Sequence, residues 1–163
     1  MHRPLRSSRR AREGSIWVDD LQGNLCELCD SAVNQTEMDL NQLSSEVIGA
    51  AIEVHRILGP GLLESTYEEC LCHELRLEHL NYDRQVGLPV SYKGNYLDCG
   101  YRIDILVEKS IILELKSVDT ILGIHKAQLL TYLKLADIHL GLLMNFNVPL
   151  MRDGIHRIVN NFV

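Results

Sequence analysis

The chain has 163 residues, enough for one domain with a sizeable core, and its hydrophobic fraction of 46% is normal for a globular protein. No apolar run approaches the roughly 18 residues that a membrane helix needs, so the sequence predicts no membrane span. The formal net charge is −6, and five arginines in the first thirteen residues leave the acidic excess to the rest of the chain. An acidic body argues against broad, non-specific nucleic-acid binding, although a local basic groove or metal-binding carboxylates stay compatible with it.

The N-terminal 36 residues lack a sustained hydrophobic period. We predict that they form a poorly ordered, basic extension to a domain over residues 37–163. The arginine-rich start is not followed by an apolar segment, so no secretory signal is expected. Five cysteines without a signal peptide suggest reduced thiols in a cytoplasmic protein. Cys26 and Cys29 alone are a weak zinc or redox signal, and we expect all the cysteines to be structural or incidental.

Three helices are predicted from apolar residues that recur at steps of three and four. They cover about residues 38–58, ending at Gly59-Pro60-Gly61, then about residues 63–79, and finally about residues 124–136. The apolar residues of the third helix spread widely, as expected for a helix packed on a sheet. The apolar positions expected to mark the three helices are Leu43, Val47, Ala50 or Ala51, Val54 and Leu58; Tyr67, Leu71, Leu75 and Leu80; and Ala127, Leu130, Leu133 and Leu135.

Five strands are predicted, over about residues 85–92, 96–107, 111–116, 139–146 and 155–159. Pro89 favours an edge position for the first strand, and Gly100 suggests a bend in the second. The Gly-Leu-Leu-Met run in the fourth strand indicates burial on both faces. The order of helices and strands predicts an α/β (α+β) domain with a mixed central β-sheet flanked by helices.

The second and third predicted strands carry charges where buried strands should be apolar. Asp104 lies in the second strand, and Glu114 and Lys116 share one face of the third because side chains alternate along a strand. A hairpin between the strands would bring Asp104 beside that face. Two buried carboxylates raise each other's pKa, and a hard cation such as Mg²⁺ removes the conflict. The alternative is a buried ion-pair cluster or an edge strand with its charges in water. We favour a functional site because an Asp, a Glu and a Lys occur together at this spacing in apolar strands.

Several short motifs follow one another in a fixed order along the body. Gly61-Leu-Leu-Glu64-Ser-Thr-Tyr67 matches the signature of the small bacterial GxxExxY proteins. The chain also resembles that family in Leu-Gly-Pro-Gly before the signature, Gly-Tyr-Arg-Ile-Asp, Glu-Leu-Lys, His-Lys-Ala-Gln-Leu-Leu-Thr-Tyr-Leu-Lys and Gly-Leu-Leu-Met-Asn-Phe. The likeness covers about residues 43–160. The family is placed in the PD-(D/E)XK nuclease-like superfamily, so the resemblance implies a restriction-endonuclease-like core in the order αβββαβ.

The resemblance also implies roles for individual residues. Asp104 and Glu114 would bind Mg²⁺ or Mn²⁺, Glu64 would complete the metal site directly or through water, and Lys116 would orient the attacking water. The Gln-x-x-x-Tyr pair of many recombination nucleases of the superfamily falls on Gln128 and Tyr132, which would position the substrate or brace the site. Two further residues, Arg102 and His125, are expected near the site. Arg102 is expected on the Asp104 face by alternation, as a phosphate contact or in a core or ion-pair role, and His125 is expected to be a helix-end or surface histidine.

The function expected from these residues is metal-dependent hydrolysis of a nucleic acid, with DNA the first candidate and no membrane partner. Two carboxylates and a lysine in apolar strands favour an enzyme. The alternative is a catalytically silent module that keeps the nuclease fold and acts through a protein partner or a homodimer. The small size and the acidic body motivate that alternative.

Overall fold

In the computed structural model, residues 39–160 are described, apart from the side chains of Tyr96 and Cys99. The predicted N-terminal extension, with Cys26 and Cys29, lies outside this range. Three α-helices, a short 3₁₀ helix and five strands follow one another in the order α1 (Leu40–Leu58), α2 (Glu64–Leu77), β1 (Tyr82–Tyr92), β2 (Asn95–Val107), β3 (Ile111–Lys116), α3 (Gly123–Ala136), β4 (Leu140–Asn145), η1 (Met151–Gly154) and β5 (Ile155–Val159).

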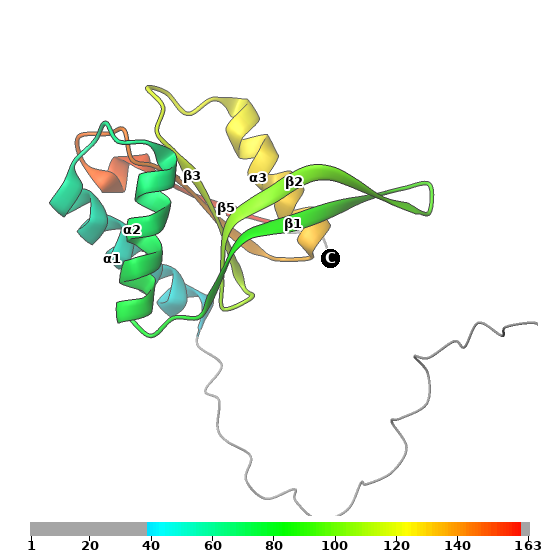
Figure 1. Cartoon of the computed structure of the whole chain (residues 1–163), viewed down its shortest axis with the longest axis horizontal. Helices are drawn as coiled ribbons and strands as arrows, with labels where there is room; N and C mark the ends of the chain where they lie inside the picture. The colour runs from blue at the N-terminus through cyan, green and yellow to red at the C-terminus, as the bar shows by residue number, and fades with distance from the viewer. Residues whose placement is uncertain (1–38, 161–163) are drawn as a thin grey trace, which may run out of the picture. The chain divides into compact units, whose positions relative to one another are not determined.

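The strands form one mixed sheet in the spatial order β1-β2-β3-β4-β5. β3 and β4 pair in parallel, with α3 as the crossover between them, and the other neighbouring pairs are antiparallel. Figure 1 shows α1 and α2 on one side of the sheet and α3 on the other. The predicted α+β architecture and its αβββαβ order are therefore confirmed, and Pro89 does lie in an edge strand.

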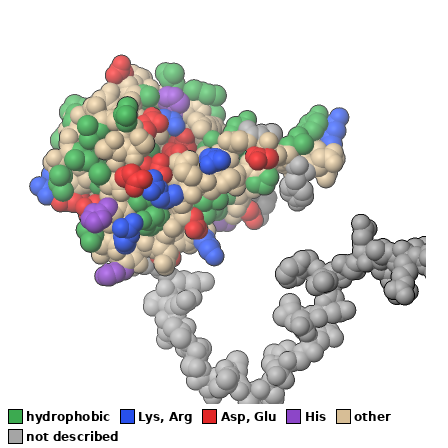
Figure 2. Space-filling view, viewed as in Figure 1, with side chains coloured by type: hydrophobic (Ala, Val, Ile, Leu, Met, Phe, Trp, Pro, Cys, Tyr) green, Lys and Arg blue, Asp and Glu red, His purple; other side chains and the backbone are tan. Residues whose placement is uncertain are grey.

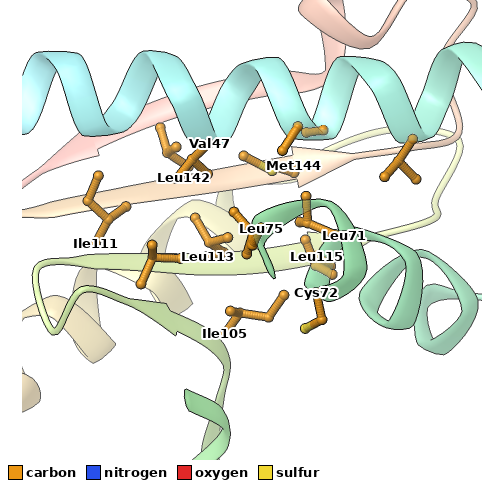
Figure 3. Close-up of a cluster of buried hydrophobic side chains, with 14 of the residues drawn as sticks. Val47, Leu71, Cys72, Leu75, Ile105, Ile111, Leu113, Leu115, Leu142 and Met144 are labelled. Atoms are coloured by element: carbon orange, nitrogen blue, oxygen red, sulfur yellow. The ribbon is translucent and has the colours of Figure 1, made fainter. Parts of the chain in front are cut away.

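Two hydrophobic clusters hold the layers together. The larger one joins α1 and α2 to one face of the central strands, through side chains such as Val47, Leu71 and Leu113 (Figure 3). The smaller one joins α3 to the opposite face, through Leu129, Leu133 and Ile112. β4 is buried along its whole length, as its apolar run predicts for a strand covered on both faces.

The apolar stripes predicted for the first two helices are largely confirmed. Leu58 is an exception, because it is partly exposed at the end of α1. In α3 the prediction was partly wrong: Ala127 and Leu135 are exposed, whereas Leu129 is fully buried. Apolar residues surround this helix, so its sequence period alone does not identify the face that meets the sheet.

The loop before α2 explains the Gly-x-x-Glu-x-x-Tyr motif in physical terms. Gly61 has a φ of +98°, a conformation that residues with a side chain rarely adopt. The buried Tyr67 donates a hydrogen bond from Oη to the Gly59 carbonyl at 2.6 Å and accepts one from the Leu62 N–H at 3.1 Å. Its ring also stacks on Phe146, with 4.3 Å between centroids. The tyrosine thus fixes the loop that leads into Glu64.

We expect Tyr67→Phe to lower the free energy of unfolding by about 2 kcal/mol, because the substitution leaves a carbonyl and an N–H of this loop without a partner. Urea unfolding followed by circular dichroism measures the difference. Tyr92→Phe is the matched control, since the Tyr92 side chain is 59% exposed. Equal stability of Tyr67→Phe and the unsubstituted protein would show that the two hydrogen bonds contribute nothing.

Candidate active site

Three charged side chains meet where β2 and β3 separate. The antiparallel pairing of these strands runs from Val107↔Ile111 to Ile105↔Leu113 and then stops. At the next position the Asp104 carboxylate accepts a hydrogen bond from the Leu115 N–H at 2.8 Å. A side chain therefore takes the place of a backbone carbonyl in the ladder, and the strands can diverge without leaving this N–H unpaired.

The direction of β2 changes at the same residue. Ile103 packs in the α3 cluster, whereas Ile105 packs in the cluster under α1 and α2. Residues two apart in a regular strand would lie on the same face of the sheet. Opposite Asp104, β1 is irregular too, since Gln85 has a φ of +50°. Side chains therefore do not alternate regularly between the two faces of the sheet across Asp104. The prediction that placed Arg102 on the Asp104 face depended on this alternation, so its premise was wrong. Arg102 itself is exposed.

Glu114 is the most deeply buried carboxylate of the site, with 2% of its surface exposed. Its Oε1 atom lies 2.6 Å from Lys116 Nζ, on the same face of β3. Within the described residues, its Oε2 atom is buried and has no hydrogen-bond partner. An unpaired buried carboxylate oxygen is costly, which is the condition that a bound cation relieves.

The electrostatics of the site follow from this burial. Burial is the main cause that raises the pKa of Glu114 to about 7, the nearby Asp104 charge adds to it, and Lys116 opposes it. Burial also raises the pKa of Asp104, against the hydrogen bond from Leu115. Burial on its own lowers the pKa of Lys116, but the hydrogen bond and charge of Glu114 outweigh it, so that pKa is raised.

Glu64 approaches the same place from the other side of the sheet. It is the first residue of α2, and its Oε1 accepts a hydrogen bond from the Ser117 N–H at 2.9 Å. The Ser117 hydroxyl in turn donates to the Leu62 carbonyl at 2.7 Å. These two contacts tie the loop before α2 to the end of β3, next to Lys116.

A metal could be held by the residues that meet here. In the range 39–160, no three side chains of His, Cys, Asp or Glu form a group that could hold a metal ion together. The candidate donors that meet here are the Asp104 and Glu114 carboxylates, and Glu64 does not join them in a group of three. The fit is nonetheless good: the half-buried Asp104 carboxylate and the buried Glu114 carboxylate, one of whose oxygens has no partner, suit a hard divalent cation, which commonly takes one or two carboxylates and fills its shell with water or phosphate.

Gln128 and Tyr132 meet each other on α3, where the Gln128 side-chain amide donates to Tyr132 Oη at 2.8 Å. Tyr132 is buried against the α3 face of the sheet. In the part of the chain that the structure describes, no hydrogen bond joins this pair to the carboxylates. His125 lies at the start of α3, where its Nδ1 accepts from the Leu122 N–H, so the expected helix-end role is confirmed.

Sequence reasoning missed four residues that support the site. Buried Glu68 accepts hydrogen bonds from Arg84 and Gln85 of β1, close enough to Asp104 for its charge to act on that carboxyl. Buried Asn145 bridges the N–H and carbonyl of Val118, and so fixes the chain beyond β3. Two signals were available: Asn145 is a polar residue at the end of an apolar strand, and Glu68 follows Glu64 by one helical turn.

A family model described as the PD-(D/E)XK nuclease superfamily matches residues 41–158, which is most of the chain. The chain belongs to this superfamily. The PD-(D/E)XK match covers every site residue discussed above and supports a nuclease-like domain, a nucleic-acid substrate class and the divalent-metal chemistry general to the superfamily. Neither the comparison with curated proteins nor the comparison with solved structures finds a match. No helix between residues 39 and 160 has the length and apolarity to cross a bilayer.

Proposed function

We propose that this domain is a metal-dependent nuclease that hydrolyses phosphodiester bonds of DNA or RNA. The observation that carries the proposal is the buried Glu114 carboxylate, which has one orphaned oxygen, next to the half-buried Asp104 carboxylate and Lys116. Burying these charges together is unfavourable for folding, as the raised pKa of Glu114 shows, so a role in binding a cation accounts for them better than a structural role. The motif that runs from Gly61 into the first turn of α2 also supports the narrower assignment to the GxxExxY proteins.

In this proposal each residue of the site has a defined task. Asp104 and Glu114 hold Mg²⁺ or Mn²⁺, and Glu64 contributes through a water molecule from its position on Ser117. When bound, the metal supplies Lewis acidity and lowers the pKa of a coordinated water. Lys116 donates hydrogen bonds to the attacking water and to the phosphate oxygens, where negative charge grows as the new bond forms.

The residues around this centre orient the substrate. Gln128 and Tyr132, already joined by a hydrogen bond, brace the α3 side of the sheet. Arg102 is exposed two residues before Asp104, and a phosphate contact is the role we assign to it. Asn145 holds Val118, the residue after Ser117, and Tyr67 holds the loop residue Leu62, whose carbonyl accepts from Ser117; both contacts help to keep Glu64 near Lys116.

The first test is calorimetric titration of Mn²⁺ and Mg²⁺ into the unsubstituted protein and into an Asp104→Ala/Glu114→Ala variant. We expect binding only in the unsubstituted protein, followed by metal-dependent cleavage in a screen of DNA and RNA. Thermal unfolding shows that the variant is folded. If the double variant cleaved as fast as the unsubstituted protein, the assignment of Asp104 and Glu114 would be refuted. If the unsubstituted protein bound no metal, cleaved no nucleic acid and formed a stable complex with a partner or a homodimer, the silent module would be favoured.

A further inference from the structure

The antiparallel pair β1–β2 extends well beyond the body of the domain. Figure 1 shows the pair continuing past α3 as a two-stranded ribbon that ends in a tight turn. We call residues 89–102 the arm. The register of the two strands shifts between Leu88 and Val90, and Gly100 has a φ of +72°, so the arm is bent at its base. The part of the arm beyond α3 is not covered by a helix and is therefore open to a ligand (Figure 1).

Among the arm residues whose side chains are described, two tyrosines expose their rings to solvent. Tyr92, near the tip, is 59% exposed, and Tyr101, at the base, is 45% exposed. The Tyr101 ring lies 6.1 Å from that of Tyr132, tilted by 59°, so Tyr132 supports it from behind. Exposed aromatic rings with a fixed orientation are the surfaces on which unpaired bases stack.

Cationic side chains accompany both rings. Lys93 Nζ lies 5.3 Å from the centroid of the Tyr92 ring, and Arg102 follows Tyr101 directly. Within the described residues, Arg102 forms no ion pair and no hydrogen bond, so its guanidinium is available to a ligand. Figure 2 shows a basic side chain at the far end of the arm, whereas acidic side chains gather on the body.

The charge distribution decides which form of nucleic acid suits the arm. Two basic residues and one acidic residue lie in the arm, against nine basic and fifteen acidic residues in the rest of the range 39–160. A duplex carries one negative charge for about every 1.7 Å of its axis and hides its base faces, so the acidic body repels it and the tyrosines gain nothing from it. A single strand can follow the narrow arm, contact its cations and stack on its rings.

We propose that the arm binds an unpaired nucleic-acid strand and leads it to Asp104. Tyr101 lies three residues, about 10 Å along the strand, from Asp104, so a strand stacked on this ring has a neighbouring phosphodiester at the carboxylates. Tyr92 and Lys93 hold the strand farther out. This inference rests on the proposed function only where it places the reacting phosphodiester at Asp104. The binding of the strand is argued from the side chains and charge of the arm alone.

The test measures binding in an Asp104→Asn background, which prevents cleavage, by fluorescence anisotropy. The probes are a labelled single strand of mixed sequence, as DNA and as RNA, and the same sequence closed into a hairpin duplex. We expect the single strand, in either backbone, to bind more tightly than the duplex. Adding Tyr101→Ala should weaken single-strand binding about tenfold, whereas adding Tyr101→Phe, which keeps the ring, should restore it.

Arg102 is tested through salt. Arg102→Ala should reduce the slope of log affinity against log salt by about 0.7, the value for one phosphate contact to a single strand, whereas Arg152→Ala, at an exposed arginine of η1, should leave the slope unchanged. Preference for the duplex, no binding of any probe, or equal affinity of Tyr101→Ala would overturn the inference. Mn²⁺ titration of the unsubstituted protein separates the two proposals. Metal binding without strand binding would refute only the role of the arm, and strand binding without metal binding would refute only the metal site.

Discussion

Lys116→Met is expected to slow metal-dependent phosphodiester cleavage on the order of a hundredfold to a thousandfold, the loss typical of removing one donor that stabilises developing negative charge. Methionine has a similar length but no charge, so the space that Lys116 fills is largely retained. The ammonium group lies 2.6 Å from Glu114 Oε1 and its side chain is 15% exposed, so it reaches both the carboxylate and a substrate at the surface. Cleavage of a labelled oligonucleotide under single-turnover conditions measures the change.

Two controls make this result specific to Lys116. Lys126→Met replaces an exposed lysine of α3 and should cleave at the unsubstituted rate. Calorimetric titration of Mn²⁺ into Lys116→Met should still show binding, because the metal ligands remain. Unchanged cleavage by Lys116→Met would remove the lysine from the mechanism. Loss of both metal binding and cleavage would give Lys116 the role of a structural partner of Glu114 instead.

Glu114→Gln is expected to make the metal-free protein more stable, relative to the unsubstituted protein, as the pH rises. The unfolded chain holds this carboxyl at its ordinary pKa of 4.5, whereas the folded protein holds it at about 7, mainly because it is buried. A folded-state pKa above the unfolded value means that the folded state binds the proton more tightly. Folding stability is therefore lost as the pH rises between these two values, and the loss is complete above the folded pKa.

The size of this effect follows from the same shift. The rise in the pKa of Glu114 from 4.5 to about 7 corresponds to a loss on the order of 3 kcal/mol, and glutamine, which stays neutral, avoids it. Urea unfolding in the presence of EDTA, repeated from acid to mildly alkaline pH, measures the difference between the two proteins. The same substitution should abolish metal binding, so stability and binding would change in opposite directions.

The control for this series is Glu53→Gln on α1. The hydrogen bond from Arg56 holds the pKa of the Glu53 carboxyl below its ordinary value. Glu53→Gln removes this carboxylate, so the variant should become less stable relative to the unsubstituted protein as the pH rises, which is the opposite of the change expected for Glu114→Gln. If the stability difference between Glu114→Gln and the unsubstituted protein did not change with pH, the buried carboxylate would carry no penalty. The physical argument for a cation site at β3 would then fail.

Most of the fold could be predicted because it depends on patterns that are local in the sequence. The glycines after α1, the apolar period of α2 and the buried run of β4 each specify one element, and the parallel β3–β4 pair then requires the α3 crossover. The start of β1 was missed at Tyr82–Arg84. This edge segment is polar and partly exposed, and it shows no alternation that could identify a strand.

The candidate site could be predicted in part for a related reason. Asp104, Glu114 and Lys116 interrupt apolar strands, and such charges are visible in a sequence without knowledge of the fold. The contact of Glu64 with the Ser117 N–H could not be foreseen, because a backbone donor leaves no mark in the sequence. The irregular backbone at Gln85 escaped for the same reason: left-handed φ at a glutamine is imposed by the surrounding structure.

The two outer strands of the sheet bear on self-association. β1 presents Pro89, which lacks an N–H, beside a shift in its register, and β5 is only five residues long. Arg157 of β5 also donates a hydrogen bond across to Asn41 of α1, which keeps a charged side chain over that border. Such features oppose the addition of a further strand at either border. In the described sheet these features work against edge-to-edge aggregation, even though the central strands are almost wholly apolar.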